Sequence, residues 1–217
     1  MATVIGIMGE SGHGKTTSIR NLDPKKTFYI DADGKGLSFK GWKKMYNHEN
    51  KNYAKTSNIE SIKAAFSKVD KDFKQFEVLI VDTVNAIMLD NEMERMKEKG
   101  YDKWIDLAQF VYGLIKDAHS LRNDLYVVFI FHVAIDSDDY GNRVARILTN
   151  GRKLEKIKLE SKLTNLLYAK CVDGKYVFET QAKNSTAKSM MGLFETFEID
   201  NDLNFVIESI KKYERGE

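Results

Sequence analysis

Residues 9–16 combine three glycines, a lysine and a threonine in one short stretch. The segment Gly9-Glu10-Ser11-Gly12-His13-Gly14-Lys15-Thr16 matches the pattern G-x-x-x-x-G-K-[ST] completely. Glycines allow consecutive backbone N–H groups to close around an anion, and a helix that starts just after them adds the positive end of its dipole. We therefore predict that this loop binds the phosphates of a nucleoside triphosphate.

The flanking sequence supports this interpretation. The apolar stretch Thr3 to Met8 predicts a strand before the loop, and a short helix is expected from about Lys15 to Leu22, where Asp23-Pro24 ends it. Lys15 is predicted to neutralise the β- and γ-phosphates, and the Thr16 hydroxyl to bind Mg²⁺. ATP and Mg²⁺ are the expected cofactors, and the candidate nucleotide-binding residues are Gly9, Glu10, Ser11, Gly12, His13, Gly14, Lys15, Thr16 and Thr17.

Asp82 is the second candidate metal ligand. It ends the apolar run 78–81, which reads as a strand buried on both faces. Such a strand delivers a carboxylate to the carboxyl edge of the sheet, where the phosphate loop also lies. The alternative is that Asp82 caps the helix that begins near Asn85; given the loop, we favour the metal role.

Two further strand ends carry candidate catalytic groups. Asp31 and Asp33 follow the strand predicted over Thr27 to Ile30, where a carboxylate could orient or deprotonate an attacking water. The same Asp-Ala-Asp-Gly composition also favours a turn, so the pattern leaves both roles open. His132 follows the strand predicted over 126–131 and could contact the γ-phosphate; a structural histidine is the alternative.

A basic segment follows this strand. The stretch 143–162 is rich in arginine and lysine, and together with Tyr140 it offers phosphate contacts and one stacking surface for single-stranded DNA. Three nearby aspartates, at 136, 138 and 139, weaken the patch, and a solvated helix face is the alternative. The candidate DNA-binding residues are Tyr140, Arg143, Arg146, Arg152 and Lys153.

Composition places the chain among folded proteins of ordinary surface charge. The 217 residues suffice for a single domain, 1–217, with 42 % hydrophobic residues and a net charge of +2. No apolar run is long enough to cross a bilayer, and the single cysteine excludes an internal disulfide and a cysteine-based zinc cage. We expect a cytoplasmic protein without a membrane partner.

The order of predicted elements positions these residues. Strands alternate with helices expected near 59–73, with a capping box at Ser57 and Glu60, and near 85–99 and 102–121. Further helices are expected over 153–167 and 202–213, a flap over 135–148, and a hairpin around Asp173-Gly174. This alternation predicts an α/β fold: a mostly parallel central sheet with helices on both faces, then a C-terminal β-hairpin plus helix.

These parts resemble the RecA-like P-loop ATPases. The segment Phe28-Tyr29-Ile30-Asp31-Ala32-Asp33 is similar to the family strand that ends Asp-Ala-Glu, which implies that Asp33 is the catalytic base. Residues 78–84 resemble the family's Walker B segment, and His132 stands where the family has a glutamine γ-phosphate sensor. The resemblance also implies a homo-oligomer, a ring or filament, in which Lys183 or Lys188 reaches the neighbouring subunit's nucleotide.

The small size resembles the compact RecA-like ATPases that bacteriophages encode for single-strand annealing and recombination. This implies single-stranded DNA, and a single-strand-binding protein, as partners in the host cytoplasm. Three other functions remain open at this point: a nucleoside or nucleotide kinase, an ATP-gated interaction module with little turnover, and a GTPase. The GTPase is disfavoured because the chain has no Asn-Lys-x-Asp motif for reading guanine.

Overall fold

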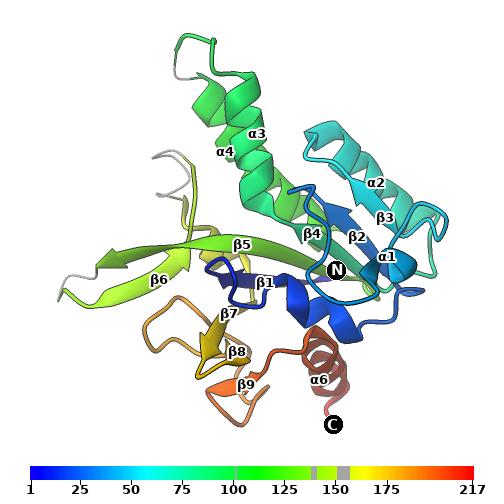
Figure 1. The fold of residues 1–217 in the computed structure, drawn as a ribbon, viewed down its shortest axis with the longest axis vertical. Coiled ribbons are helices and arrows are strands. Elements are labelled where there is room, and N and C mark those ends of the chain that lie inside the picture. Colours follow the sequence, from blue (N-terminus) through cyan, green and yellow to red (C-terminus); the bar gives the residue numbers. More distant parts are fainter. Residues whose placement is uncertain (101, 138–140, 151–156) are drawn as a thin grey trace.

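A mixed sheet forms the centre of the molecule (Figure 1). The computed structural model describes residues 1–100, 102–137, 141–150 and 157–217. Among these, nine strands run in the order β3-β2-β4-β5-β1-β7-β8-β9, with β6 paired to β5. The strands are β1 (Thr3–Gly9), β2 (Thr27–Asp31), β3 (Tyr53–Lys55), β4 (Val78–Asp82), β5 (Tyr126–Ser137), β6 (Arg143–Ile147), β7 (Asn165–Val172), β8 (Lys175–Glu179) and β9 (Glu198–Asp200).

The six strands from β3 to β7 are parallel, so their carboxyl ends meet at one edge. In this register Gly9, the last residue of β1, pairs with His132 on β5, and Asp31 on β2 pairs with Asp82 on β4. The strands β8, β9 and β6 are antiparallel to their neighbours. The sheet therefore brings the candidate residues of four separate segments to the same edge.

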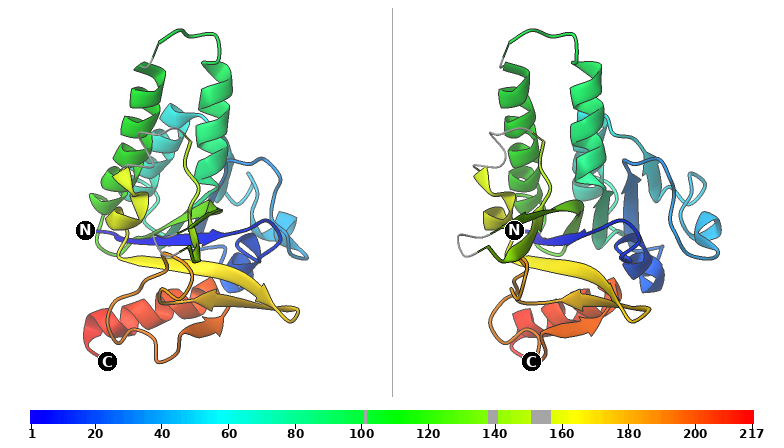
Figure 2. Two further views of the ribbon diagram at one scale, coloured as in Figure 1. Left: turned by 90° about the vertical axis from the view of Figure 1, so that its left-hand side faces the viewer. Right: turned by 60° about the vertical axis from the view of Figure 1, so that its left-hand side comes forward.

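Helices cover both faces of the sheet (Figure 2). Alternate residues of the central strands pack on opposite sides, because successive strand side chains point to opposite faces: Leu79 and Val81 lie in one core cluster, Val78 and Ile80 in the other. The first cluster packs against α2 (Ile59–Lys71), α3 (Val84–Glu94) and α4 (Asp102–His119). The second packs against the 3₁₀ segment η1 (Thr16–Asn21) and α6 (Leu203–Arg215).

The predicted fold class is confirmed, including the parallel sheet, the helices on both faces and the C-terminal hairpin with its helix. Some local predictions are wrong. The short helix expected after the phosphate loop is present, as a 3₁₀ helix, whereas the short elements α1 (Trp42–Met45), β3 and β9 were not expected. Residues 165–167, predicted as helix, instead begin β7, and the 3₁₀ turn η2 (Leu159–Lys162) precedes that strand.

No helix in the described part of the chain is both long and apolar enough to cross a membrane. The flap predicted over 135–148 is a two-stranded ribbon: β5 continues past the sheet and pairs with β6, from Val133 opposite Ile147 to Ser137 opposite Arg143. Figure 1 shows this ribbon extending away from the rest of the sheet. It begins one residue after His132, so the ribbon is a direct continuation of the strand that reaches the sheet edge.

The N-terminus of α2 corrects the predicted capping box. The N-cap residue is Asn58, not Ser57, and the Asn58 side-chain oxygen accepts a hydrogen bond from the Ser61 backbone N–H at 3.0 Å. An N-cap side chain satisfies one of the backbone N–H groups that have no partner within the helix. The start of α2 is therefore stabilised by the residue after the predicted one.

We expect Asn58→Ala to lower the free energy of unfolding by about 1 kcal/mol, because the replacement removes this cap. Ser57→Ala is the matched control and should change stability by no more than about 0.5 kcal/mol. Urea denaturation of both variants measures the difference. A larger loss in Ser57→Ala than in Asn58→Ala would contradict the observed cap.

Candidate functional site

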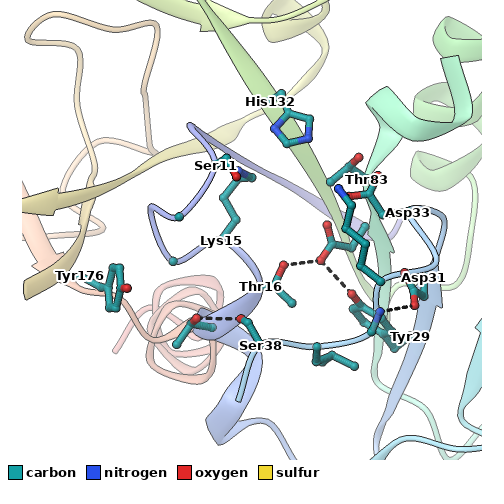
Figure 3. A pocket seen from close by; sticks show the side chains of 17 residues that line it. Ser11, Lys15, Thr16, Tyr29, Asp31, Asp33, Ser38, Thr83, His132 and Tyr176 are labelled. Atoms are coloured by element: carbon teal, nitrogen blue, oxygen red, sulfur yellow. Dashed lines mark hydrogen bonds and ion pairs between the residues drawn. The ribbon is translucent and has the colours of Figure 1, made fainter. Parts of the chain in front are cut away.

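A cavity of about 410 Å³ lies at the carboxyl edge of the parallel strands (Figure 3). Its walls come from the phosphate loop, the ends of β2 and β4, the loop after β2, the middle of β5 and the tip of the β7–β8 hairpin. The lining residues are Ser11, Gly12, Gly14, Lys15, Thr16, Thr17, Tyr29, Asp31, Asp33, Lys35, Gly36, Leu37, Ser38, Asp82, Thr83, His132 and Tyr176.

Six of the nine predicted nucleotide-binding residues line this cavity: Ser11, Gly12, Gly14, Lys15, Thr16 and Thr17. Gly9, Glu10 and His13 complete the loop without being among the lining residues. Gly14 has a φ of +84°, and a Cβ at this position would lie 2.8 Å from the Tyr176 ring. Glycine is therefore required there both by backbone conformation and by space.

Lys15 is buried, with 7 % of its surface exposed. Its ammonium donates to the carbonyl oxygens of Gly9 at 2.9 Å and Glu10 at 2.8 Å. Burial lowers the pKa of Lys15, and the negative charge of Asp82 opposes that change. The ammonium thus lies within the loop, held by neutral acceptors, at the position where phosphate oxygens are predicted.

Asp82 is buried at the end of β4 and accepts two hydrogen bonds at the same oxygen, Oδ2. The Thr16 hydroxyl donates at 2.7 Å and the Tyr29 hydroxyl at 2.8 Å. Burial raises the pKa of Asp82, and both hydroxyl donors act against that shift. Carboxylate and hydroxyl oxygens are ligands that suit Mg²⁺, so Thr16 and Asp82 are the two residues here that could hold this ion.

The helix-capping alternative for Asp82 does not apply, because Thr83 caps α3. The Thr83 side chain accepts from the Ala86 backbone N–H at 3.2 Å, and Thr83 is the N-cap residue. Asp82 contributes nothing to that helix start and faces the cavity instead.

Asp31 and Asp33 have different surroundings. The Asp31 carboxylate accepts from the backbone N–H groups of Gly34 at 2.7 Å and Gly36 at 2.8 Å, and from the Tyr53 hydroxyl at 2.6 Å. Asp31 therefore has the turn-forming role and fixes the loop after β2. Among the described residues, the one partner of the Asp33 carboxylate is the Lys35 ammonium, in an ion pair at 2.9 Å, and both side chains line the cavity.

His132 lies on β5 and is half-buried at the edge of the cavity. Its backbone N–H donates to the Asn85 side-chain oxygen at 2.7 Å, which fixes the strand beside the start of α3. Burial lowers the pKa of His132, and the positive charge of Lys15 lowers it further. A neutral imidazole therefore faces the cavity at neutral pH.

Several lining residues were not predicted from the sequence. Tyr29 holds Asp82, Lys35 pairs with Asp33, and Ser38 lies 3.0 Å from the Thr17 hydroxyl. Tyr29 lies two residues before Asp31, a spacing that places both on one side of a strand and could have indicated it. Tyr176 offered no such signal, since its position depends on how the hairpin packs on the loop.

None of the other candidates that the structure describes is among the residues that line the cavity. Arg143 and Arg146 are on β6, and Arg146 faces Asp136 across the ribbon at 3.7 Å. Neither Lys183 nor Lys188 lines the cavity of its own chain among the residues described. Tyr140, Arg152 and Lys153 lie outside the described residues.

A comparison with known families decides the class of this site. Residues 1–189 match the family described as "AAA domain". The chain belongs to this family. With its intact loop and its α/β fold, this AAA domain is a P-loop ATPase.

Two other comparisons, with curated proteins and with solved structures, do not narrow this class further. No curated protein matches this AAA domain. Among solved structures it is similar to a KaiC-like protein from the hyperthermophilic archaeon Pyrococcus horikoshii OT3, with 11 % sequence identity and a TM-score of 0.46. That alignment covers 81 % of this chain and 76 % of the other.

The two aspartates after β2 should respond differently to substitution. In Asp31→Asn an amide NH₂ replaces one accepting oxygen and leaves a partly buried donor unpaired, so we expect a loss of about 1–3 kcal/mol in the free energy of unfolding. Asp33→Asn removes one ion pair to an exposed lysine and should cost less than about 1 kcal/mol. Urea denaturation of both variants tests this. Equal losses would show that Asp31 does not organise the loop.

Proposed function

We propose that this P-loop ATPase hydrolyses ATP with Mg²⁺ and acts on single-stranded DNA in phage recombination, annealing or replication. The proposal of ATP hydrolysis is based on one observation: a single cavity is lined by Lys15, Thr16, Asp82 and Asp33. These residues supply a cation, two oxygen ligands for a metal and a carboxylate, which are the parts that in-line attack on a γ-phosphate requires.

The residues fit a magnesium ion. Thr16 and Asp82 present hydroxyl and carboxylate oxygens that are already 2.7 Å apart, at the carboxyl end of a buried strand. Mg²⁺ prefers oxygen ligands and is bound in such sites by few protein groups. When bound, the ion supplies positive charge that neutralises the phosphate oxygens.

The chain's own residues perform the other tasks. Lys15 stabilises the negative charge that develops on the β- and γ-phosphates, and the glycine-rich loop orients them through its N–H groups. Asp33 positions the attacking water and accepts its proton. His132 lies on β5 opposite Gly9 and lines the cavity, and we assign to it the contact with the γ-phosphate.

Lys15→Ala should reduce ATP hydrolysis at least about 100-fold, because a preorganised charge at the transferring phosphoryl group is lost. Lys25→Ala, which removes an exposed lysine after η1, is the matched control and should hydrolyse ATP normally. Steady-state phosphate release with MgATP measures both, and circular dichroism checks that each variant folds. Normal turnover in Lys15→Ala would refute the proposed site.

Two results would favour the alternatives. Phosphorylated nucleosides among the products would indicate a kinase, in which an acceptor hydroxyl replaces water. Nucleotide binding without hydrolysis, together with ATP-dependent affinity for a protein partner, would indicate an ATP-gated interaction module. Either result would keep the proposed role of the phosphate loop in nucleotide binding and would change only the proposed step that follows binding.

The proposed DNA partner is supported by the ribbon of β5 and β6. It continues directly from His132 and carries Arg143 and Arg146 on opposite faces of β6, so basic side chains that can contact phosphates lie on a ribbon joined covalently to the nucleotide cavity. We also propose assembly into a ring or filament in the cytoplasm, with Lys183 or Lys188 reaching the neighbouring subunit's nucleotide and a single-strand-binding protein as a further partner. Neither lysine is among the described lining residues of its own chain's cavity, which is compatible with a role in the neighbouring subunit.

Single-stranded DNA should stimulate ATP hydrolysis at low salt, and the stimulation should fade as salt rises, because counterions compete for the phosphate contacts. The double variant Arg143→Ala/Arg146→Ala should lose the stimulation and keep basal hydrolysis. Lys212→Ala/Arg215→Ala, which removes two exposed cations from α6, is the matched control. Stimulation that persists in the ribbon variant would exclude the ribbon as the DNA contact.

A further inference from the structure

Tyr176 is an exposed aromatic residue on the wall of the nucleotide cavity. It lies on β8, two residues after the Gly174 of the hairpin turn, and 43 % of its surface is exposed. Its ring is so close to the phosphate loop that a Cβ on Gly14 would lie 2.8 Å from Cδ1 and 3.0 Å from Cγ. The loop therefore packs against the inner part of the ring, and the rest of the ring is open to the cavity.

The backbone around Tyr176 is fixed relative to the loop. The Tyr176 carbonyl accepts from the Asn201 backbone N–H at 3.3 Å, and the next residue, Val177, pairs with Asp200 on β9. Arg20, on the η1 segment that follows the phosphate loop, donates to the Asn201 carbonyl at 2.5 Å. The hairpin and the η1 segment are thus joined through Asn201, so the backbone that carries the ring is fixed before any ligand binds.

The charged residues of the cavity and the exposed Tyr176 ring lie at opposite ends (Figure 3). In Figure 3 Asp31 and Asp33 lie on one side of the phosphate loop and Tyr176 on the opposite side. Lys35 pairs with Asp33 at the acidic end, and Lys15 and Asp82 complete the charged part of the lining. A nucleoside triphosphate has the same division, with charged phosphates at one end and an aromatic base at the other.

We propose that Tyr176 stacks on the base of the bound nucleotide and thereby sets the preference for nucleotides over inorganic polyphosphate. This inference rests on the proposed ATP site and adds its base-binding side chain. Stacking on a tyrosine ring is worth about 1–3 kcal/mol per base and tolerates any base, because every base has a π-face. Tyr176 therefore contributes affinity without choosing between adenine and guanine.

The competing explanation is that Tyr176 only packs against Gly14 and supports the loop. The two roles differ in their effect on a ligand that has phosphates and no base. Loss of support would weaken inorganic tripolyphosphate and nucleotide alike, whereas loss of stacking would weaken the nucleotide alone.

The test is calorimetric titration, in the presence of Mg²⁺, with the non-hydrolysable β,γ-imido analogues of ATP and GTP and with inorganic tripolyphosphate. We expect Tyr176→Ala to weaken both nucleotide analogues about 5- to 150-fold, the equivalent of that stacking energy. Its affinity for tripolyphosphate should stay within about twofold of the parent protein. Tyr176→Phe and Tyr176→Trp keep a ring and should retain nucleotide affinity. Tyr213→Ala, which removes an exposed tyrosine from α6, is the matched control.

Unchanged nucleotide affinity in Tyr176→Ala would overturn the proposal, and so would an equal loss of nucleotide and tripolyphosphate affinity. A parent protein that binds neither ligand would refute the proposed function itself. Binding of tripolyphosphate with no gain from an attached nucleoside would keep the phosphate site and overturn only the role of Tyr176.

Discussion

The site depends on the burial of one carboxylate, that of Asp82. Only 4 % of this residue is exposed, and removing an ionised carboxylate from water is costly unless its oxygens accept hydrogen bonds. The donors are two hydroxyls: Thr16, from the segment after β1, and Tyr29, from β2. They reach the same oxygen only if β1, β2 and β4 end at the same level, although β5 separates β1 from β4. The register of the sheet therefore determines the geometry of the site.

A second carboxylate is held in the same way one strand further out. Asp31 accepts from the Tyr53 hydroxyl on β3 and from two amides of the following loop, so a strand end and a loop share one anchor. The rings of Tyr29 and Tyr53 stack with centroids 6.1 Å apart. Two neighbouring tyrosines thus hold two neighbouring aspartates. Because the Asp31 carboxylate is committed to the loop, Asp33 is the member of this pair whose carboxylate does not hold the loop.

The sequence predicts the parts of this arrangement that local pattern encodes. The phosphate loop is recognisable in the sequence because its backbone conformation requires glycine at fixed positions. The buried strands are recognisable because their apolar runs are unbroken. The error at 165–167 has a physical source: Leu163, Leu166 and Leu167 fit helical spacing, yet Leu166 and Leu167 lie in different core clusters, as alternating strand residues do. Elements as short as β3 and α1 carry too few residues to show a period. The roles of Tyr29, Lys35 and Tyr176 come from contacts between distant segments, which no local pattern records.

Both lysines of the cavity already have partners, and the nature of those partners determines how a polyanion can enter. Lys15 is held by two neutral carbonyl oxygens, which bind an ammonium less strongly than charged phosphate oxygens do. Lys35 is held by the charged Asp33, but its side chain is 75 % exposed, and ion pairs in that position contribute little. The present contacts of both lysines are therefore weak enough to be exchanged for contacts with a polyanion, and an exchange at Lys35 would remove the ion pair of Asp33. Because both lysines make only weak contacts, the cavity is preorganised for a charged ligand. The same contacts ensure that no buried charge is unpaired when the ligand is absent.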